Sequence, residues 1–353
     1  MISNICKSNG APIRVVIIDD TATIRRILNH VLSKDPLIRV VGTASDPLEA
    51  RELIKKTNPD VVTLDVEMPN MNGLEFLRRL MRLRPIPVVM VSTVTNRGSE
   101  IALKALELGA VDVFGKPQRA KIDDWLGLVE IVKGAAQAQL SCKSSGNSHF
   151  HYPNYAGWNG KIVAIGASTG GVNALETILQ KFPKDCPPTM IVQHMSELFL
   201  NSFVSRVDAK YKPKIQIAES GVSLTTGQVL IAPGGHHHLS IGKNQQNVEL
   251  VKANKVSGHR PSVDVLFESL FPHANGVVAV LLTGMGRDGA TGLKGLRDRG
   301  ACTIAQDEAS SVVYGMPRAA IEEKAVEKIL PLNEIAQAIL EKTFKSILLD
   351  GEV

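Results

Sequence analysis

Short apolar runs alternate with polar, amphipathic stretches along the first third of the chain. Most of the apolar runs are rich in β-branched residues, and each ends at a polar or glycine-containing turn. Five βα repeats of this length indicate a parallel sheet covered by helices on both faces, although spacing alone does not give the strand order. The predicted strands are IRVVIID (13–19), IRVVGTA (38–44), DVVTLD (60–65), PVVMVS (87–92) and VDVFGK (111–116), with helices near 21–34, 47–56, 74–83 and 98–108.

The pattern breaks between Gly134 and Gly160 and then resumes. This segment is rich in Ser, Gly, Asn and aromatic residues and has no steady period, so we predict an exposed linker whose first residues finish a helix. From Lys161 to about Leu348, strands and helices alternate again. The predicted fold class is α/β, with two doubly wound parallel-sheet domains joined by a linker. The expected boundaries are a flexible N-terminus (1–12), a first domain (13–133), the linker (134–158) and a second domain (159–350).

Composition narrows the class of protein. Apolar residues make up 44% of the 353 residues, and no run of about 18 of them predicts a membrane span. The first twelve residues lack a hydrophobic signal-peptide centre, and the four cysteines show no metal-ligand spacing, so we expect a cytoplasmic protein with reduced thiols. The net charge of +5 is a small excess spread along the chain, and it does not imply a nucleic-acid partner.

Polar residues end four of the strands predicted in the first domain. The first strand ends in Asp19 and Asp20, the third in Asp65, and the last two in Ser92 and Lys116. Because parallel strands end at one edge of a sheet, these side chains are expected to converge. Three carboxylates without Cys or His suit a hard cation such as Mg²⁺, and one of them can then attack phosphorus to give an aspartyl phosphate. The acids could instead be simple helix caps, but five suitable residues at strand ends favour the phosphoryl site.

This set resembles the receiver domain of bacterial response regulators. The resemblance is carried by VVIIDD, LDVEMPNMNG, VMVST and FGKP within residues 13–117. It implies a flavodoxin-like fold and phosphorylation of one aspartate with the help of Mg²⁺. It makes Asp65 the phosphorylated residue, Asp19, Asp20 and Asp65 the metal ligands, and Ser92 and Lys116 the switch contacts.

The last strand of this domain departs from the receiver pattern. The aromatic residue of many receivers falls at Val113 or is displaced to Phe114. The route by which a phosphorylation signal leaves the pocket is therefore less well predicted than the pocket itself.

Three apolar strands of the second domain end near residues that acid–base catalysis uses. KIVAIGAS ends at Ser168, TMIVQHM contains His194, and VVAVLLTGMGRD ends at Asp288. If these strands lie parallel in one sheet, all three residues reach its carboxyl edge, where open α/β sheets place their sites. A nucleophile, a base and an orienting acid are then present, as in serine hydrolases. The rival candidates for the acid are Asp264, Asp307 and Glu308.

The segment GASTGG (166–171) has the G-x-S-x-G pattern between a strand and a predicted helix (171–181). Such a turn exposes the serine hydroxyl, and the helix N-terminus adds donors where negative charge develops. The N–H groups near Thr169 and Met285 are candidate oxyanion donors. A dinucleotide-binding turn is the competing interpretation, but it requires an acid at the end of the next strand, where this chain has Gln193–His194.

At this point the second domain resembles the chemotaxis response-regulator protein-glutamate methylesterases, the CheB family. The motifs are GASTGG, IVQHM, IAPGG, SGHRPSVDVLF, LLTGMGRDGA and YGMP, which span most of residues 159–345. The resemblance implies a catalytic triad of Ser168, His194 and Asp288 that needs no cofactor. It also implies hydrolysis of glutamyl methyl esters on chemoreceptors, with release of methanol, and deamidation of receptor glutamines. One departure is Val172, where proline is common.

Other histidines of the second domain give weaker hypotheses. The run His236–His238 looks like a metal site, but adjacent strand residues alternate faces and no third ligand is evident. His259 and Arg260 lie in a family motif, and either a place in the substrate groove or a surface role fits them.

The resemblance also implies partners and a mode of regulation. The substrates would be the cytoplasmic domains of methyl-accepting chemoreceptors, and the phosphodonor a chemotaxis histidine kinase, with no nucleic acid and no direct membrane insertion. The unphosphorylated receiver would inhibit the esterase, and phosphorylation would relieve this inhibition. The rival functions are a DNA-binding regulator, which predicts a short basic helical output domain, and a scaffold whose hydrolase site has decayed.

Overall fold

A computed structural model describes residues 11–68, 71–93, 95–117, 122–140, 155–243 and 246–346. The chain divides into two compact units, Met1–Ser141 and Cys142–Val353. Most of the predicted N-terminal segment (1–12) and of the predicted linker (134–158) lies outside the described residues.

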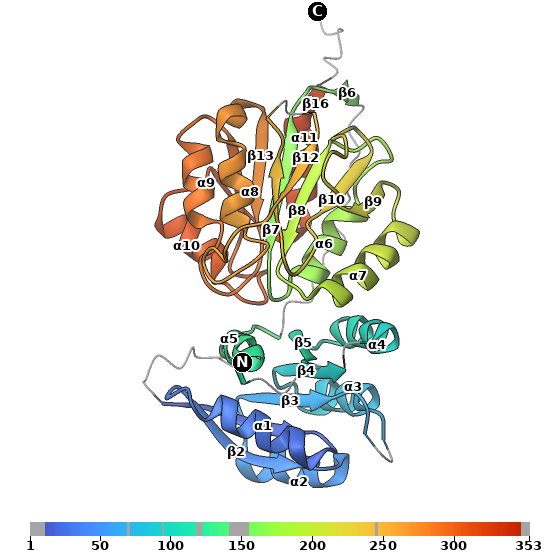
Figure 1. The fold of residues 1–353 in the computed structure, drawn as a ribbon, viewed down its shortest axis with the longest axis vertical. Helices are drawn as coiled ribbons and strands as arrows, with labels where there is room; N and C mark the ends of the chain where they lie inside the picture. The colour runs from blue at the N-terminus through green and yellow to red at the C-terminus, as the bar shows by residue number, and fades with distance from the viewer. Residues whose placement is uncertain are drawn as a thin grey trace, which may run out of the picture. The chain divides into compact units, whose positions relative to one another are not determined.

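The first unit is a five-stranded parallel sheet with helices on both faces (Figure 1). The strand order β2-β1-β3-β4-β5 is that of flavodoxin-like folds, as the receiver resemblance implied. Each predicted strand and helix of this region is present. The strands are β1 (Ile13–Ile18), β2 (Ile38–Ala44), β3 (Val61–Asp65), β4 (Val88–Thr93) and β5 (Asp112–Lys116); the helices are α1 (Ala22–Leu32), α2 (Pro47–Thr57), α3 (Gly73–Leu83), α4 (Asn96–Glu107), η1 (Ile122–Trp125) and α5 (Leu126–Ala135).

Local sequence signals place the start of α3 against the end of β3. The Asn72 side chain accepts a hydrogen bond from Leu74 N at 2.9 Å and so caps the helix. A Cβ atom on Gly73 would lie only 2.1 Å from the carbonyl oxygen of Asp65. The Asn-Gly pair therefore begins the helix and also leaves room for the backbone of the expected phosphorylation site.

The second unit is a seven-stranded parallel sheet in the order β15-β14-β13-β7-β8-β10-β9. From β7 the chain proceeds to β8 on one side and later returns to β13 on the other. The switch point therefore lies at β7, where ligands of open α/β sheets bind. The strands are β7 (Ile162–Ala167), β8 (Thr189–Gln193), β9 (Lys214–Ile217), β10 (Gln228–Ile231), β13 (Val277–Leu281), β14 (Cys302–Gln306) and β15 (Lys328–Leu330).

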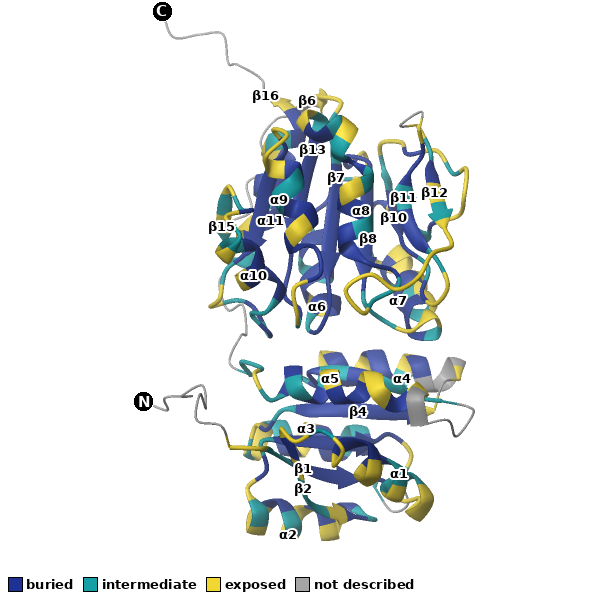
Figure 2. Cartoon of the chain, turned by 60° about the vertical axis from the view of Figure 1, so that its left-hand side comes forward, coloured by how far each residue is buried: buried dark blue, intermediate teal, exposed yellow. Residues whose placement is uncertain are grey.

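Helices cover both faces of this sheet (Figures 1 and 2). On one face α8 packs beside α9, and on the other face α6 packs beside α11. The helices are α6 (Gly171–Leu179), α7 (Glu197–Lys210), α8 (Val263–Ser269), η2 (Phe271–Gly276), α9 (Ala290–Arg297), α10 (Met316–Glu322) and α11 (Leu332–Thr343).

Two short antiparallel pairs were not predicted from the sequence. One joins β11 (His238–Ile241) to β12 (Val248–Val251), and the other joins β6 (Tyr155–Trp158) to β16 (Phe344–Ser346). The second pair is extended by Asn159, whose backbone N–H donates to the Thr343 carbonyl at 2.9 Å. Because β6 falls inside the segment predicted as linker, these residues belong to the second unit instead.

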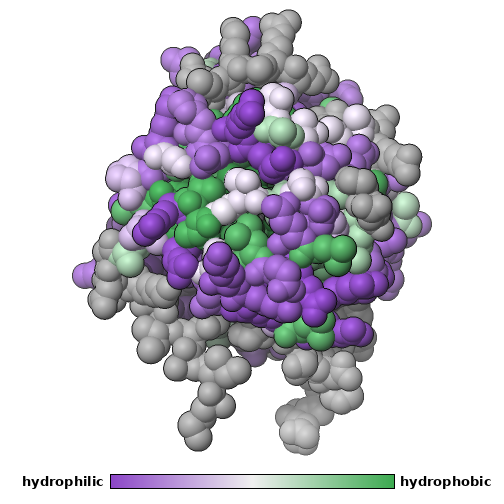
Figure 3. Space-filling model, turned by 90° about the horizontal axis from the view of Figure 1, so that it is seen from below, coloured by the Kyte–Doolittle hydropathy of each residue, from purple (hydrophilic) through white to green (hydrophobic). Residues whose placement is uncertain are grey.

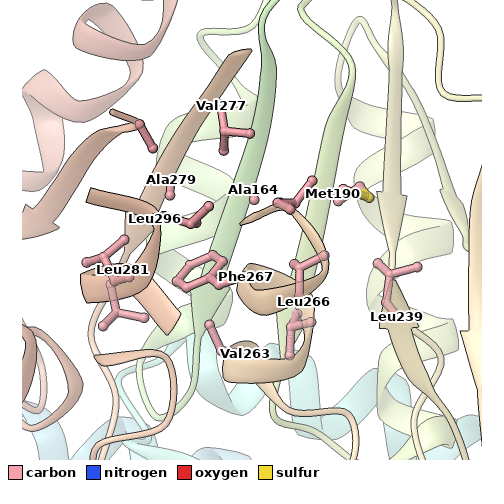
Figure 4. Packing of buried hydrophobic residues seen from close by; sticks show 14 of the residues in the cluster. Ala164, Met190, Leu239, Val263, Leu266, Phe267, Val277, Ala279, Leu281 and Leu296 are labelled. Atoms are coloured by element: carbon pink, nitrogen blue, oxygen red, sulfur yellow. The ribbon is translucent and has the colours of Figure 1, made fainter. Parts of the chain in front are cut away.

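The core of the second unit lies between α8 and the central strands (Figure 4). Val263 and Phe267 on α8 are fully buried and belong to the same hydrophobic cluster as Ala164 on β7. Burial of a side chain such as phenylalanine contributes about 1.5–3 kcal/mol. A Cβ atom on Gly166 would lie 2.3 Å from Val263 Cγ1, so the absence of a side chain at this glycine lets α8 approach the site edge of the sheet.

The surface of the described chain gives no sign of a membrane span. None of its helices has the length and apolar character that crossing a membrane requires. Figure 3 shows a face on which hydrophilic groups surround smaller apolar groups. Isolated exposed apolar side chains, such as Leu48 and Leu83 in the first unit, are ordinary on folded domains and assign no partner.

Candidate active site

Three carboxylates and one ammonium group meet at the carboxyl edge of the first sheet. One oxygen from each of Asp19, Asp20 and Asp65 lies within 4.8 Å of the others, and this is the single group of its kind among the described residues. Lys116 Nζ lies 2.8 Å from Asp19 Oδ2 and 2.8 Å from Asp65 Oδ2. The predicted convergence of these four residues is therefore present.

The electrostatics of this pocket favour an additional cation. Burial raises the pKa of Asp65 to about 6, although Lys116 opposes this shift. Burial also acts to lower the pKa of Lys116, but hydrogen bonds to Asp19 and Asp65 outweigh it and raise the pKa. One ammonium group thus neutralises only part of the acidic cluster. The all-oxygen donor set fits Mg²⁺, which prefers carboxylate and water ligands.

Ser92 and Phe114, the other receiver residues singled out in the sequence, lie on β4 and β5. Ser92 is buried at the end of β4, and its hydroxyl donates to the carbonyl of Thr93 at 3.3 Å. Val91 pairs with Asp65 across β3 and β4, so Ser92 lies one residue beyond the carboxylate. Phe114 packs against the ring of Trp125, with centroids 5.8 Å apart. The displaced aromatic residue of β5 therefore contacts η1.

In the second unit, Ser168 begins the turn that follows β7. It is 9% exposed, and its backbone N–H donates to the Thr283 carbonyl at 3.1 Å. Gly170 has φ +79°, and a Cβ atom there would lie 2.6 Å from Val312 Cβ. Only glycine fits this position without strain. The G-x-S-x-G pattern thus corresponds to a sharp turn between β7 and α6.

Backbone and side-chain hydrogen bonds join the serine turn to the end of β8. Gln193 Nε2 donates to the carbonyls of Ser168 at 2.9 Å and His194 at 3.1 Å. The backbone N–H of His194 donates to the Ala167 carbonyl at 3.0 Å. The expectation that the tips of these strands are neighbours is confirmed by their direct pairing.

Asp288 contacts His194 from the other side of β7. The distance from His194 Nε2 to Asp288 Oδ2 is 2.9 Å, and Asp288 is 1% exposed. Its carboxylate also accepts hydrogen bonds from Ser262 Oγ at 2.7 Å, Val263 N at 2.8 Å and Asp264 N at 3.1 Å. Burial alone would raise the pKa of Asp288, but His194 and these donors lower it to about 2. The carboxylate is therefore ionised at neutral pH.

The rival acids have other partners in the structure. Asp264 Oδ1 accepts a hydrogen bond from Gly292 N at 2.8 Å, and burial together with the charge of Asp288 raises its pKa to about 6. Asp307 accepts hydrogen bonds from the backbone N–H and the hydroxyl of Ser310 and so stabilises a turn. The hydrogen bond of His194 to Asp288 therefore favours Asp288 over Asp264 and Asp307 as its acidic partner.

One nitrogen of His194 remains available for chemistry. Nε2 is engaged by Asp288, whereas Nδ1 is buried and has no hydrogen-bond partner within the described part of the chain. The hydroxyl of Ser168 does not reach it in this structure. Catalytic hydrogen bonds are often long in the absence of substrate. The missing hydrogen bond between Ser168 and His194 therefore does not argue against a catalytic pairing of these two residues.

A second turn lies directly against Ser168. A Cβ atom on Gly284 would be 2.7 Å from Ser168 Cβ and 2.3 Å from Met316 Sδ. The turn after β13, which carries Met285, therefore packs on the serine turn, which carries Thr169. Since the N–H of Ser168 is already bonded to Thr283, these neighbouring residues remain the candidate oxyanion donors.

One histidine of the run 236–238, His238, has a structural role that was not predicted from the sequence. His238 is fully buried; its Nδ1 accepts a hydrogen bond from Ser262 N at 3.1 Å and its Nε2 donates to the Asn254 carbonyl at 2.9 Å. This side chain thus supports Ser262, which in turn contacts Asp288. A serine before an apolar run is an N-cap signal that could have identified Ser262 as the start of α8. His236 is exposed.

Comparisons with known proteins identify the families of the two units. The model of the CheB methylesterase family matches residues 163–339, and that of the response regulator receiver domain matches residues 15–124. A Caulobacter vibrioides protein named protein-glutamate methylesterase/protein-glutamine glutaminase 1 is 52% identical, with 94% of this chain and 98% of that protein covered. A protein of the same name from Rhizobium johnstonii is 50% identical, with coverages of 95% and 97%.

A solved structure supports the fold of the second unit. The catalytic domain of the Thermotoga maritima CheB methylesterase is 36% identical, with a TM-score of 0.50, and the match covers 52% of this chain and 98% of that domain. The sequence relatives extend the similarity across both units. The chain therefore belongs to the CheB methylesterase family, with a response regulator receiver domain preceding the methylesterase domain.

Proposed function

We propose that the protein hydrolyses glutamyl methyl esters on the cytoplasmic domains of chemoreceptors, and deamidates receptor glutamines, during chemotaxis. The observation that carries this proposal is the ionised Asp288 bonded to His194 beside the Ser168 turn. The names of the relatives supply the substrate class. The seven-stranded parallel sheet of the second unit contradicts the rival prediction of a helical DNA-binding output domain.

The proposed reaction begins with transfer of the Ser168 hydroxyl proton to His194 Nδ1 as the oxygen attacks the ester carbonyl. The oxyanion accepts hydrogen bonds from the N–H groups of Thr169 and Met285, and Asp288 stabilises the imidazolium. His194 then protonates the departing methoxide, giving methanol and an acyl-enzyme. Water repeats the sequence and releases a receptor glutamate. With a glutamine substrate, ammonia leaves instead.

Phosphorylation of Asp65 is the proposed control. Asp19, Asp20 and Asp65 would hold Mg²⁺, which supplies charge neutralisation for an incoming phosphoryl group, and Lys116 would pair with its oxygens. A chemotaxis histidine kinase is the proposed phosphodonor. The unphosphorylated receiver inhibits the esterase, and phosphorylation shifts the population toward an uninhibited state. The proposed domain boundaries are 13–133 and 159–350, with the second domain extended back to β6.

The test is methanol release from methylated receptor membranes by the purified full chain, with and without acetyl phosphate and Mg²⁺. We expect release to rise with the phosphodonor, to lose this rise in Asp65→Asn, and to fall by several orders of magnitude in Ser168→Ala. Retained release by folded Ser168→Ala would exclude the serine mechanism. No release from the folded wild-type chain in either condition would favour the scaffold hypothesis.

A further inference from the structure

A second imidazole lies face to face with the imidazole of His194. The ring centroids of His194 and His259 are 3.8 Å apart, and the ring planes differ by 5°. His194 directly follows β8, whereas His259 lies in the segment between β12 and α8. The contact therefore joins two distant parts of the chain at His194, the general base of the proposed triad. The hydrogen bonds of His194 and Asp288 do not require it.

The backbone holds His259 in this position. Its N–H donates to the Val256 carbonyl at 2.9 Å, and its carbonyl accepts from Val256 N at 3.0 Å. The next residue, Arg260, donates to the carbonyls of Gly235 at 2.8 Å and Ala253 at 2.8 Å. The segment is thus fixed on both sides of the histidine. A side chain on a backbone held in this way has less freedom to lose when substrate binds.

Burial keeps the ring of His259 neutral. Burial lowers the pKa of His259 to about 4, and His194 and Lys255 act in the same direction, whereas Asp288 opposes the shift. A neutral ring can lie against an imidazole that becomes an imidazolium during the reaction, because its face attracts a cation.

We propose that His259 is a positioning residue that fixes the ring plane of His194, so that Nδ1 faces Ser168 while Asp288 holds Nε2. One hydrogen bond at the edge of a ring tolerates tilting, because such bonds weaken steeply only below about 120°. A second ring stacked on the face of His194 removes that freedom. This inference rests on the proposed triad, and small misplacements of a catalytic group can cost about 10²-fold in rate.

The experiment compares His259→Ala and His259→Phe in the full chain, with His237→Ala as the matched control on a nearby segment. One measurement is the NMR shift of the His194 ring protons, assigned with His194→Gln. Stacking places these protons over a neighbouring ring and moves them upfield. The other measurement is kcat and KM for methanol release from methylated receptor membranes.

We expect His259→Ala to lose the upfield shift and to lower kcat by about 10-fold or more, with KM changed less than about 2-fold. His259→Phe should keep the shift and restore kcat to within about 3-fold of the wild type. Full activity of His259→Ala would overturn the proposal. Equal loss in both variants with the shift kept in His259→Phe would also overturn it, since the imidazole would then act chemically.

The two measurements separate this inference from the proposed function. If the wild-type chain showed no Ser168-dependent methanol release, the proposed function would fail. The NMR measurement would still show whether the rings of His194 and His259 are stacked, because the ring-proton shift does not depend on turnover. Unshifted His194 protons in the wild type would contradict the stacked geometry itself.

Discussion

At the scale of single residues, Asp264 and Asp288 show how one small region gives two carboxyl groups different protonation. Both are buried beside the first turn of α8. Asp288 accepts hydrogen bonds from three donors there and also contacts His194, whereas Asp264 accepts a backbone N–H and faces the charge of its neighbour. The pKa values of the two groups therefore diverge, to about 2 for Asp288 and about 6 for Asp264.

This divergence predicts a pH-dependent effect of Asp264→Asn. Because the folded pKa of Asp264 is raised to about 6, the folded chain binds this proton more tightly than the unfolded chain between pH about 4 and 6. Its contribution to stability is present at low pH and is lost as the pH rises through about 6. Asparagine keeps an oxygen for Gly292 N and has no charge to bury. From pH 4.5 to pH 7, the free energy of unfolding of the variant should increase by about 1–3 kcal/mol relative to that of the wild type.

Urea unfolding at the two pH values measures this difference. A Trp125→Phe background leaves Trp158 as the single tryptophan, and it reports on the second unit. His259 acts in the opposite direction in both proteins, since its lowered pKa makes stability fall as the pH drops below about 6.5. Its effect cancels in the comparison. A constant offset between variant and wild type at the two pH values would contradict the assignment.

At the scale of elements, the site depends on how closely two turns approach each other. The turn after β13 packs on the turn after β7 because Gly284 has no side chain. We expect Gly284→Ala to push these turns apart and to lower kcat for methanol release by about 100-fold, because the reacting groups lose their alignment. Retention of the far-ultraviolet circular dichroism spectrum would show that the sheet remains.

A matched glycine in the same domain provides the control. A Cβ atom on Gly276, at the end of η2, meets nothing within 4 Å, and its φ is not in the left-handed region. Gly276→Ala should therefore leave activity and fold close to those of the wild type. Equal losses in the two variants would show that general sensitivity of the domain, and not the close approach at Ser168, causes the effect.

The elements also show what could be predicted from the sequence. The central strands were predictable because each is a continuous apolar run that stops at a turn, and their tips carry Asp65, Ser168 and His194. The contact of Ser262 with Asp288 was not predictable, because it depends on the packing of α8 against β7. The pairs β6–β16 and β11–β12 were missed because strands of three or four residues carry too little periodicity.

The role of His259 was left open by the sequence for a related reason. A histidine in a loop motif fits a groove or a surface equally well until its neighbours are known. The structure places it against His194, which follows β8 and is distant from His259 in the sequence. The roles of Ser168, His194 and Asp288 stay predictions, and the test of them is the loss of methanol release in Ser168→Ala.

At the scale of the whole molecule, the β6–β16 pair determines where the second unit begins. Asn159 Nδ2 donates to the Lys342 carbonyl at 2.9 Å, and Phe344 is 5% exposed. A chain beginning at residue 161 loses this pairing, whereas one beginning at residue 155 keeps it. We expect the shorter chain to melt about 2–8 °C lower, since about 1–2 kcal/mol shifts Tm by that amount in a domain of this size.

Differential scanning calorimetry of the two shortened chains measures this effect. Both lack the receiver, so any difference between them comes from residues 155–160. Equal melting temperatures would mean that the antiparallel pair contributes nothing to the stability of the domain, and the boundary would return to residue 159.

The same pair has a consequence for how the domain can be rearranged. Because β6 and β16 are paired by hydrogen bonds, the first and last strands of the methylesterase domain lie next to each other. A domain with adjacent ends can be joined end to end and opened elsewhere, or inserted as a cassette into a surface loop of another protein. The receiver is then one of many domains that could be attached at these adjacent ends, because the sheet, the helices and the serine turn all lie within the methylesterase domain.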